Sequence, residues 1–222
     1  MLKVVVCDVN ETLFSLEAFR PRLKEVGLGQ SNALELWFAT ALRDGISLSA
    51  AGDFATFREV ASNAVRTLLA QTGSAADTGK AAETVVEGFG EVEAHSDVHP
   101  GLQAIHDSGI KVCTMTNGSK EVTQKFLARS KLDFVSPVLD VEGPRAWKPC
   151  RAAYEYVLRQ LGLQAHEVML VAVHPWDCNG AKAAGFKTAF IARKGEEFPE
   201  IFQAPDYHAA SLEDLAEQLR TK

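Results

Sequence analysis

The segment directly after the first apolar run of the chain is rich in side chains that can do chemistry. Residues 4–14 read VVVCDVNETLF, so Asp8 ends the run, Asn10 follows two residues later and Thr12 four residues later. A carboxylate held in a tight turn can attack carbon or phosphorus and form an ester, which divides one difficult step into two easier ones. A solvated loop explains Asp8 alone, but it does not explain all three residues as readily. We therefore predict that Asp8 is a nucleophile.

Similar polar residues follow three later segments of the chain. They are Thr116 and Asn117 after one apolar run, Lys148 with Pro149 in the loop after the next, and His174, Trp176 and Asp177 after the last. In an open parallel sheet, ligands bind beyond the carboxyl ends of the strands, so these residues are expected to converge with Asp8. A nucleophilic carboxylate must stay ionised, and a nearby cation lowers its pKa. Lys148 is the predicted source of that charge.

The apolar runs predict the strands that bring these residues together. Strands are expected over residues 3–7, 110–115, 134–139, 168–173 and 188–192, and helices over 102–108, 120–130, 150–161, 180–184 and 210–219. Strands that alternate with helices of this length indicate a parallel sheet flanked by helices on both faces. The predicted fold class is therefore α/β, with a doubly wound, Rossmann-like parallel sheet.

The segment after the first strand shows no strand pattern. It is expected to form four helices, over residues 16–26, 32–43, 53–71 and 75–89. Asp53 is the expected N-cap of the third helix, and Gly45, Gly52 and Gly73 are expected in the connections. We predict a helical cap domain of residues 15–94, inserted into an α/β core of residues 1–14 and 95–222.

Bulk properties argue against several classes of protein. The 222 residues carry a net charge of −6, whereas a nucleic-acid-binding surface would be basic. No apolar run approaches the roughly 18 residues of a membrane span, and the N-terminus lacks the regions of a signal peptide. The four cysteines form no CxxC pair and are expected to be reduced thiols of a cytoplasmic protein. A small-molecule substrate is expected, without nucleic-acid or membrane partners.

These motifs resemble those of the haloacid dehalogenase-like (HAD) superfamily over the whole chain. They are DVNETL (8–13), TNGS (116–119), KP (148–149) and HPWDCNGA (174–181). The helical insertion after the first motif resembles the superfamily's small helical cap. The TNGS and WDxxGA forms are most similar to the type II 2-haloacid dehalogenase branch. The resemblance implies a hydrolase that forms an aspartyl ester and needs no cofactor, and the family is often dimeric.

The resemblance also implies catalytic roles. Thr12 and Lys148 would orient and charge-balance Asp8, and water activated near Asp177 would cleave the ester. His174 has two interpretations. With an ordinary pKa near 6.5 it could orient or deprotonate the hydrolytic water, or it could only cap the end of the strand.

A second set of residues is implied at the substrate. The set is Asn10, Thr116, Asn117, Tyr154, Phe38 and Trp176. Thr116 would bind the substrate carboxylate and Asn117 the halide, with Tyr154 near the substrate or Lys148. Phe38 stands where the branch has an arginine that contacts the halide, so no cation is expected there. Arg43 lies five residues further on and would point about 140° around the helix.

Two alternatives remain open beside cleavage of a short (S)-2-halocarboxylic acid. Phosphatases of the superfamily carry an acid two residues after the nucleophile, where this chain has Asn10, whose amide exchanges no useful proton. A magnesium-dependent phosphate-monoester hydrolase would use Asp8, Asp177 and the Asn10 carbonyl, a thin ligand set for a hard cation. No metal is therefore expected, although magnesium stays open. The second alternative is a non-catalytic binding protein on the same fold.

Overall fold

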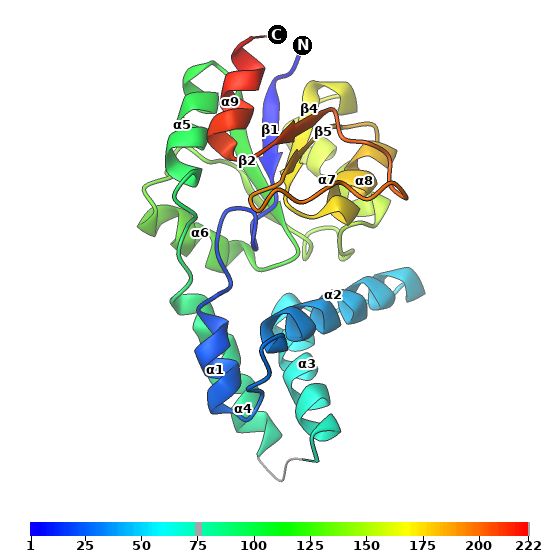
Figure 1. Cartoon of the computed structure of the whole chain (residues 1–222). Coiled ribbons are helices and arrows are strands. Elements are labelled where there is room, and N and C mark those ends of the chain that lie inside the picture. Colours follow the sequence, from blue (N-terminus) through cyan, green and yellow to red (C-terminus); the bar gives the residue numbers. More distant parts are fainter. Residues whose placement is uncertain (74–76, 222) are drawn as a thin grey trace.

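A parallel sheet forms the upper part of the molecule in Figure 1, which is a computed structural model that describes residues 1–73 and 77–221. Within those residues six strands pair in the order β3-β2-β1-β4-β5-β6, all in parallel. The strands are β1 (Val4–Cys7), β2 (Lys111–Thr116), β3 (Val138–Asp140), β4 (Val168–Ala172), β5 (Lys187–Ile191) and β6 (Tyr207–Ala209). This is the doubly wound order, in which successive strands are added on one side of β1 up to β3 and then on its other side from β4. The predicted Rossmann-like α/β fold is confirmed.

Helices cover both faces of the sheet. In Figure 1, α5 (Val98–Asp107) and α9 (Leu212–Arg220) lie on one side, and α7 (Arg151–Leu161) and α8 (Pro175–Ala183) on the other. Every residue of β1 and β4 is buried, as expected for central strands with helices on both faces. Helix α6 (Lys120–Arg129) joins β2 to β3, and the 3-10 turn η2 (Ala165–Glu167) precedes β4.

The remaining helices lie beyond the carboxyl ends of the strands (Figure 1). They are α1 (Phe19–Glu25), α2 (Ala33–Ala51), α3 (Phe57–Gln71), α4 (Thr78–Val86) and the 3-10 turn η1 (Glu87–Gly90). The segment from the start of α1 to the end of η1, connections included, is called the helical part. The rest of the chain is called the sheet part. The buried Trp37 ties α2 to α3, because its Nε1 donates to the carbonyl of Ala61 at 2.9 Å.

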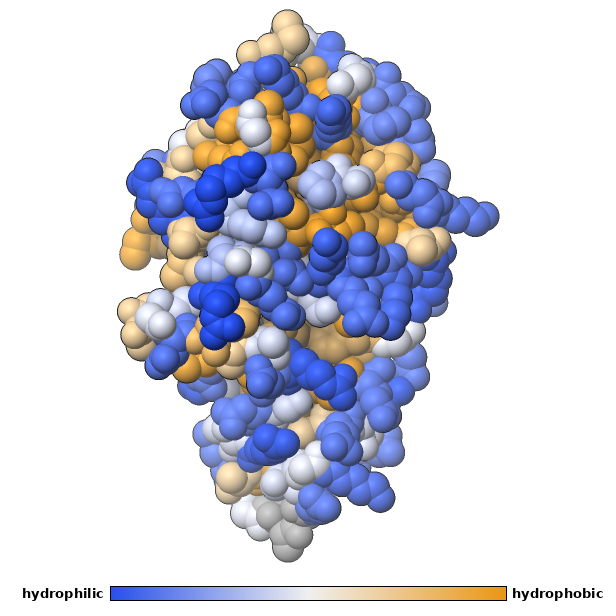
Figure 2. Space-filling model, turned by 180° about the vertical axis from the view of Figure 1, so that it is seen from behind, coloured by the Kyte–Doolittle hydropathy of each residue, from blue (hydrophilic) through white to orange (hydrophobic). Residues whose placement is uncertain are grey.

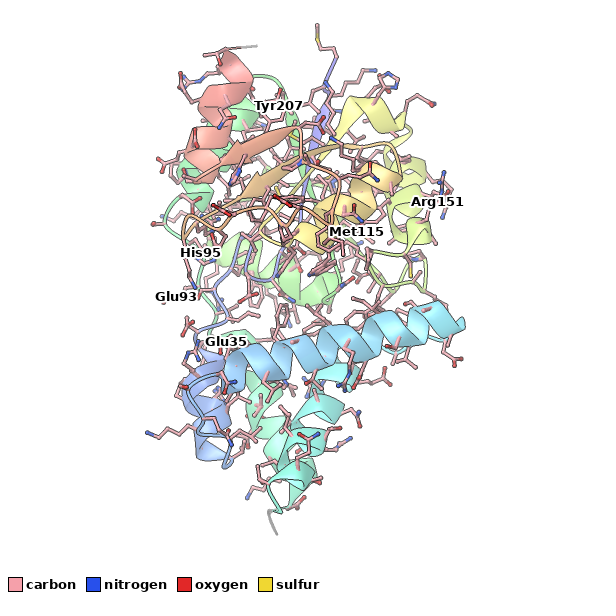
Figure 3. All side chains as sticks on the ribbon, turned by 45° about the vertical axis from the view of Figure 1, so that its right-hand side comes forward. Glu35, Glu93, His95, Met115, Arg151 and Tyr207 are labelled. Atoms are coloured by element: carbon pink, nitrogen blue, oxygen red, sulfur yellow. The ribbon has the colours of Figure 1, made fainter. Side chains whose placement is uncertain are left out.

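Two sets of contacts join the helical part to the sheet part. At the connecting segments, Ser15 N donates to Glu93 O at 2.9 Å and His95 N donates to Leu13 O at 3.1 Å (Figure 3). On the other side, Trp147 Nε1 donates to Ala55 O at 2.9 Å. Trp147 precedes Lys148, so this contact fixes the backbone next to a predicted catalytic residue.

The structure corrects two expectations in the helical part. Gly45 lies inside α2, which runs on to Ala51, and not in a connection. A Cβ at Gly45 would lie 2.4 Å from the ring of Trp147, so the glycine is required by packing and not by a turn. The N-cap of α3 is Thr56, which forms a capping box with Glu59, and not Asp53. The expected start of the fourth helix at residue 75 lies outside the described residues.

Two expectations in the sheet part also need correction, and one strand was not predicted. The expected strand over 134–139 is only β3, and it begins directly after Pro137, which has no N–H to donate. Helix α8 begins at Pro175 and not at residue 180, with proline in the first turn where no donor is needed. The short strand β6 was not predicted, because three residues with a central histidine give no apolar run.

Candidate active site

Asp8 lies directly after β1, beside the point where the strand order reverses. The residue is 4% exposed, and both carboxylate oxygens accept hydrogen bonds. Lys148 Nζ donates to Oδ1 at 2.8 Å, and Thr12 Oγ1 donates to Oδ2 at 2.7 Å. The Thr12 hydroxyl in turn accepts from Val173 N at 3.1 Å, which links the loop after β1 to the end of β4. The predicted pairing of Asp8 with Thr12 and Lys148 is therefore present.

Lys148 is fully buried and is held by its own backbone as well as by its charge. Its N–H donates to Asn117 Oδ1 at 2.8 Å, and its carbonyl accepts from Asn117 Nδ2 at 3.2 Å. Its Nζ also contacts Asp177 Oδ2 at 2.5 Å. The ammonium group thus bridges Asp8, on the loop after β1, and Asp177, in the first turn of α8.

Asp177 is fully buried, and Tyr154 on α7 donates to its Oδ1 at 2.6 Å. This contact requires close approach of α7 to α8. Gly180 permits it, since a Cβ there would lie 2.6 Å from Tyr154 Oη. Both oxygens of Asp177 are therefore occupied, one by Lys148 and one by Tyr154.

His174 sits above Asp8 with a carboxylate at each ring nitrogen. Nδ1 lies 3.0 Å from Asp8 Oδ2, and Nε2 lies 3.3 Å from Glu11 Oε2. The ring stacks on Trp176, with centroids 5.1 Å apart, and contacts the ring of Phe38 on α2, with centroids 5.9 Å apart. Because a carboxylate can only accept, both ring nitrogens must donate, which makes His174 an imidazolium.

The charges of this cluster shift one another's pKa values. Burial opposes ionisation of Asp8, but the charge of Lys148 and the hydrogen bond of His174 outweigh it and hold the pKa of Asp8 well below its usual range. Burial likewise opposes protonation of His174, yet the hydrogen bonds to Asp8 and Glu11 raise its pKa to about 9.

The second carboxylate of the cluster behaves in the opposite way. Burial raises the pKa of Asp177, and the charge of Lys148 offsets this only in part. Burial would lower the pKa of Lys148, but Asp177 and Asp8 together raise it, so the lysine stays charged. The pKa values of the two carboxyl groups are thus shifted in opposite directions, which makes Asp8 the weaker base and Asp177 the stronger. Sites in which two acids have different roles show the same separation of pKa values.

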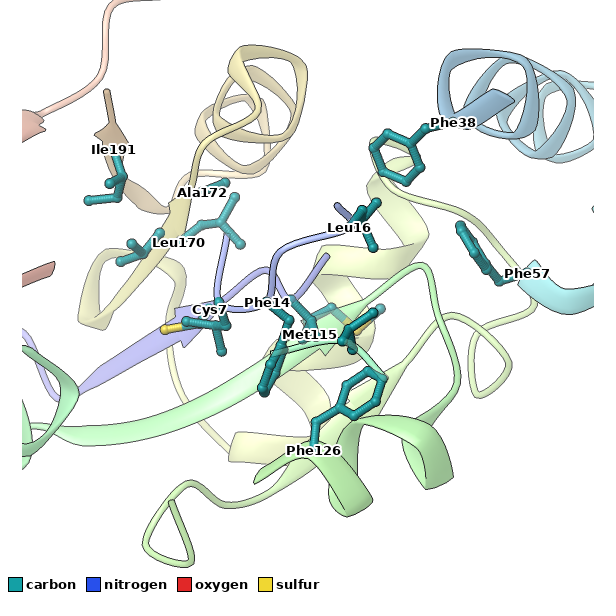
Figure 4. Packing of buried hydrophobic residues seen from close by; sticks show 14 of the residues in the cluster. Cys7, Phe14, Leu16, Phe38, Phe57, Met115, Phe126, Leu170, Ala172 and Ile191 are labelled. Carbon is teal, nitrogen blue, oxygen red and sulfur yellow. The ribbon is translucent and has the colours of Figure 1, made fainter. Parts of the chain in front are cut away.

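Aromatic side chains of the helical part close the space over Asp8. Figure 4 shows Phe38 on α2 and Phe57 at the start of α3 extending toward the sheet part. The remaining cavity has a volume of about 10 Å³ and is lined by Asp8, Asn10, Phe38, Leu42, Phe57, Asn117, His174 and Trp176. Arg43 does not reach this space, because its side chain is 64% exposed and its Nε donates to Asp44 at 2.8 Å.

The predicted site residues therefore fall into three groups. Those joined directly by hydrogen bonds are Asp8, Thr12, Lys148, Asp177, Tyr154 and His174. Those lining the cavity are Asn10, Phe38, Asn117 and Trp176. Thr116 is buried, but its hydroxyl accepts from Gly118 N at 2.8 Å and it does not line the cavity.

Three residues of the site, Leu42, Phe57 and Glu11, were not predicted, and Phe57 lines the cavity from the start of α3. Leu42 lines the cavity from α2, one helical turn after Phe38. Glu11 contacts His174 from a backbone with φ of +61°, a conformation that non-glycine residues rarely adopt. The sequence feature that could have indicated Glu11 is its position in the DVNETL motif, between the predicted site residues Asn10 and Thr12.

Three further observations concern the described residues. All four cysteines are free, and three of them, Cys7, Cys113 and Cys178, are buried. In the part of the chain that the structure describes, no three His, Cys, Asp or Glu side chains are grouped so that they could hold a metal ion. Likewise, none of the helices in residues 1–73 and 77–221 has the length and apolar character needed to cross a membrane.

Comparisons with known proteins place this geometry in context. The chain is 26% identical over 222 residues to an (S)-2-haloacid dehalogenase of Pseudomonas sp. (strain YL), covering 99% of this chain and 95% of that protein. It is 28% identical to (S)-2-haloacid dehalogenase 4A of Burkholderia cepacia, covering 96% and 93%. The fold matches L-2-haloacid dehalogenase from Xanthobacter autotrophicus with chloropropionic acid covalently bound, with a TM-score of 0.88 at 22% identity, covering 99% of each chain.

The model of one protein family matches most of the sequence. The match extends over residues 2–185. It includes all four motifs and both parts of the molecule, so it does not rest on the sheet alone. The chain belongs to the haloacid dehalogenase-like hydrolase family.

Proposed function

We propose that this hydrolase is a 2-haloacid dehalogenase that acts on a short (S)-2-halocarboxylic acid through an ester at Asp8. One observation carries the proposal: the buried Lys148 ammonium lies 2.8 Å from Asp8 Oδ1 and 2.5 Å from Asp177 Oδ2. The two acids are thus balanced by an ammonium group, which suits displacement of a leaving group that needs no proton. The names of the two dehalogenase relatives are the source of the (S) configuration.

In the first step a carboxylate oxygen of Asp8 attacks C2 of the substrate. The new C–O bond forms as the carbon–halogen bond breaks, the halide leaves with the bonding electrons, and C2 is inverted. Lys148 keeps Asp8 ionised for this attack, since its charge lowers the pKa of that carboxyl. A halide leaves as a stable anion and needs no proton, so this step does not require an acidic side chain at position 10, where the chain has Asn10.

In the second step water adds to the carboxyl carbon of Asp8, and the alkoxy oxygen leaves with C2 as a 2-hydroxy acid. Charge develops on the Asp8 oxygen next to Lys148, and the ammonium stabilises it. Asp177 is the more basic of the two acids and would accept the proton of the water. Each of its oxygens accepts one hydrogen bond, from Lys148 or from Tyr154, and keeps a second lone pair that would accept from the water. Asp177 then passes this proton to the departing alkoxy oxygen, which becomes the hydroxyl of the 2-hydroxy acid. The second proton of the water is released to solvent, so that Asp8 is again a carboxylate.

For His174 the geometry favours the orienting role over the role of a base. An imidazolium has no free lone pair, so it cannot take a proton from water. It can donate from Nδ1 to Asp8 Oδ2, and Glu11 fixes the opposite nitrogen. We propose that His174 holds the Asp8 carboxylate against rotation during attack.

For the substrate we propose contacts from the residues that line the cavity. Asn117 and Trp176 carry N–H groups next to the space over Asp8, and N–H donors suit a halide or a carboxylate. Thr116 does not line the cavity, so its contact with the substrate carboxylate is proposed from the family resemblance alone. Phe38 supplies an apolar wall in place of a cation.

The magnesium-dependent alternative fits these residues poorly. The two carboxylates that would hold the cation, Asp8 and Asp177, are both bonded to Lys148 Nζ. A divalent cation between them would meet the ammonium charge, and a hard cation prefers six or more oxygens. No step of the proposed mechanism therefore uses a metal.

Three wider expectations are kept as proposals. The division into a core of residues 1–14 and 95–222 and a cap of residues 15–94 is supported by the paired connecting segments at Ser15 and Glu93. A cytoplasmic location is supported by the free, buried thiols. A homodimer is proposed from the family resemblance alone.

The test is chloride release from (S)-2-chloropropionate, measured by ion chromatography with EDTA present. Release by the unmodified protein and none by Asp8→Asn would support the proposal. A phosphate-ester panel with magnesium is measured in parallel. Phosphate release together with no chloride release would reject the dehalogenase assignment, and binding of 2-haloacids with neither product would favour the non-catalytic alternative.

A further inference from the structure

The cavity over Asp8 is too small for the proposed substrate. Its volume of about 10 Å³ equals roughly the space for one water molecule. Even 2-chloropropionate has six non-hydrogen atoms, so the substrate must occupy additional space next to Asp8.

A much larger cavity adjoins it between the helical part and the sheet part. Its volume is about 430 Å³, within the range of roughly 300–1,000 Å³ that is typical of small-molecule sites. Asn10 and Phe57 line both cavities, so these two side chains form the boundary between them. Figure 2 shows the surface recessed between the two parts of the molecule, with apolar side chains inside the recess.

The inner wall of this larger cavity is apolar. Phe57, Val86 and Phe126 are at most 5% exposed, and Phe89 and Val122 are partly buried beside them. Charged residues of the lining are exposed at its rim, and two of these charges neutralise each other, with Lys125 Nζ 2.7 Å from Glu121. The wall therefore suits an uncharged hydrocarbon group, and the rim faces solvent.

The boundary between the two cavities is narrow on the sheet side. Gly118 lines the larger cavity next to Asn10, and a Cβ at Gly118 would lie 3.6 Å from Asn10 Nδ2 and 3.1 Å from Thr116 Oγ1. On the helical side, Phe57 stacks on Trp147 with centroids 5.7 Å apart and contacts Phe89 at 5.6 Å. A hydrocarbon chain attached to C2 of a substrate above Asp8 would thus pass between Gly118 and Asn10 on one side and the Phe57 ring on the other.

We propose that the larger cavity binds the hydrocarbon substituent on C2, so that the preferred substrates are 2-haloacids with a chain of four or more carbons beyond C2. This inference rests on the proposed function and adds the substrate class. Each methylene group that moves from water into such a cavity is expected to raise kcat/KM roughly fourfold. A chain longer by three methylenes should then gain about 60-fold.

The experiment compares kcat/KM for bromide release from (S)-2-bromopropionate and (S)-2-bromohexanoate. The chain of the second acid is three methylenes longer. The expected result is a kcat/KM for bromohexanoate at least 10-fold above that for bromopropionate, which allows for imperfect packing of the chain. Equal or lower kcat/KM for bromohexanoate, with bromopropionate active, would overturn the inference and leave the proposed function intact. No bromide release from either acid would reject the proposed function and the inference with it.

A cavity-filling variant gives a second, independent readout. Val122→Trp on α6 places a large ring in the larger cavity, and Val122 does not line the space over Asp8. The ratio of kcat/KM values, bromohexanoate to bromopropionate, should fall at least 10-fold. Leu36→Trp is the matched control, because Leu36 is 48% exposed and lines neither cavity. An unchanged ratio in a folded Val122→Trp protein would overturn the inference. If that variant does not fold, the chain-length comparison in the unmodified protein decides.

Discussion

Replacing Lys148 by methionine removes the ammonium charge that lies between the buried acids Asp8 and Asp177. Asp8 would keep its contact with the His174 imidazolium, but Asp177 would lose its cation, and breaking a buried ion pair from one side costs about 3–5 kcal/mol. For a domain of this size, 1 kcal/mol lowers Tm by roughly 2–4 °C, so the expected loss is about 6–20 °C near neutral pH.

The loss should depend on pH with a definite sign. In the unmodified protein the pKa of Asp8 is lowered, so its stabilising contribution is complete above the ordinary pKa near 3.9 and is lost only as the pH falls through the folded-state value. Without Lys148 one carboxyl of the pair takes up a proton, and its pKa rises above the ordinary value. Such a group stabilises the fold at low pH and loses that effect as the pH rises. The variant should therefore be closer to the unmodified protein at pH 5 than at pH 8.

Urea unfolding at both pH values measures this difference. His174 titrates in both proteins, so its contribution largely cancels in the comparison. Lys125→Met is the control, because Lys125 and its partner Glu121 are both exposed and their pairing is expected to change stability little. A deficit for Lys148→Met that is the same at pH 5 and pH 8, or no larger than that of the control, would refute the ion-bridge reasoning.

Three other changes have expected outcomes. Because the pKa of His174 is raised to about 9, unfolding free energy should fall by on the order of 3 kcal/mol between pH 6.5 and 9, and His174→Gln should remove this slope in pH-dependent urea titrations. Gly45→Ala should destabilise the fold by about 1–3 kcal/mol, since its Cβ would lie 2.4 Å from Trp147; a gain from better helix propensity would contradict this. Tyr154→Phe should cost roughly 1.5–3 kcal/mol in the same assay, because Asp177 loses a charged hydrogen bond, and an unchanged Cm would show that the bond is not formed.

The convergence of the site was predictable because it depends on strand ends. Parallel strands place their carboxyl ends on one edge, so polar residues after β1, β2, β3 and β4 had to meet there. Asp8, Lys148 and Asp177 could therefore be selected from sequence without knowledge of any distance. The parallel pairing of the strands followed from the alternation of strands and helices, whereas their order was not predicted.

Other features depend on contacts that no local pattern contains. Gly45 resembles a helix breaker, and only the ring of Trp147, about 100 residues later, explains it as a packing residue. The hydrogen bond that His174 donates to Glu11 is made with a left-handed backbone at Glu11, which its residue type does not favour. The cationic state of His174 follows from its two carboxylate partners and could not be read from the HPWD segment.

The most direct test of the central claim is a single turnover in ¹⁸O-labelled water, with enzyme in excess over (S)-2-chloropropionate. An ester at Asp8 is hydrolysed at the carboxyl carbon, so the label should enter the peptide that contains Asp8, where mass spectrometry detects it, and the 2-hydroxy acid should stay unlabelled. Label in the hydroxy acid with none in the Asp8 peptide would mean that water attacks C2 directly, and it would contradict Asp8 as the nucleophile.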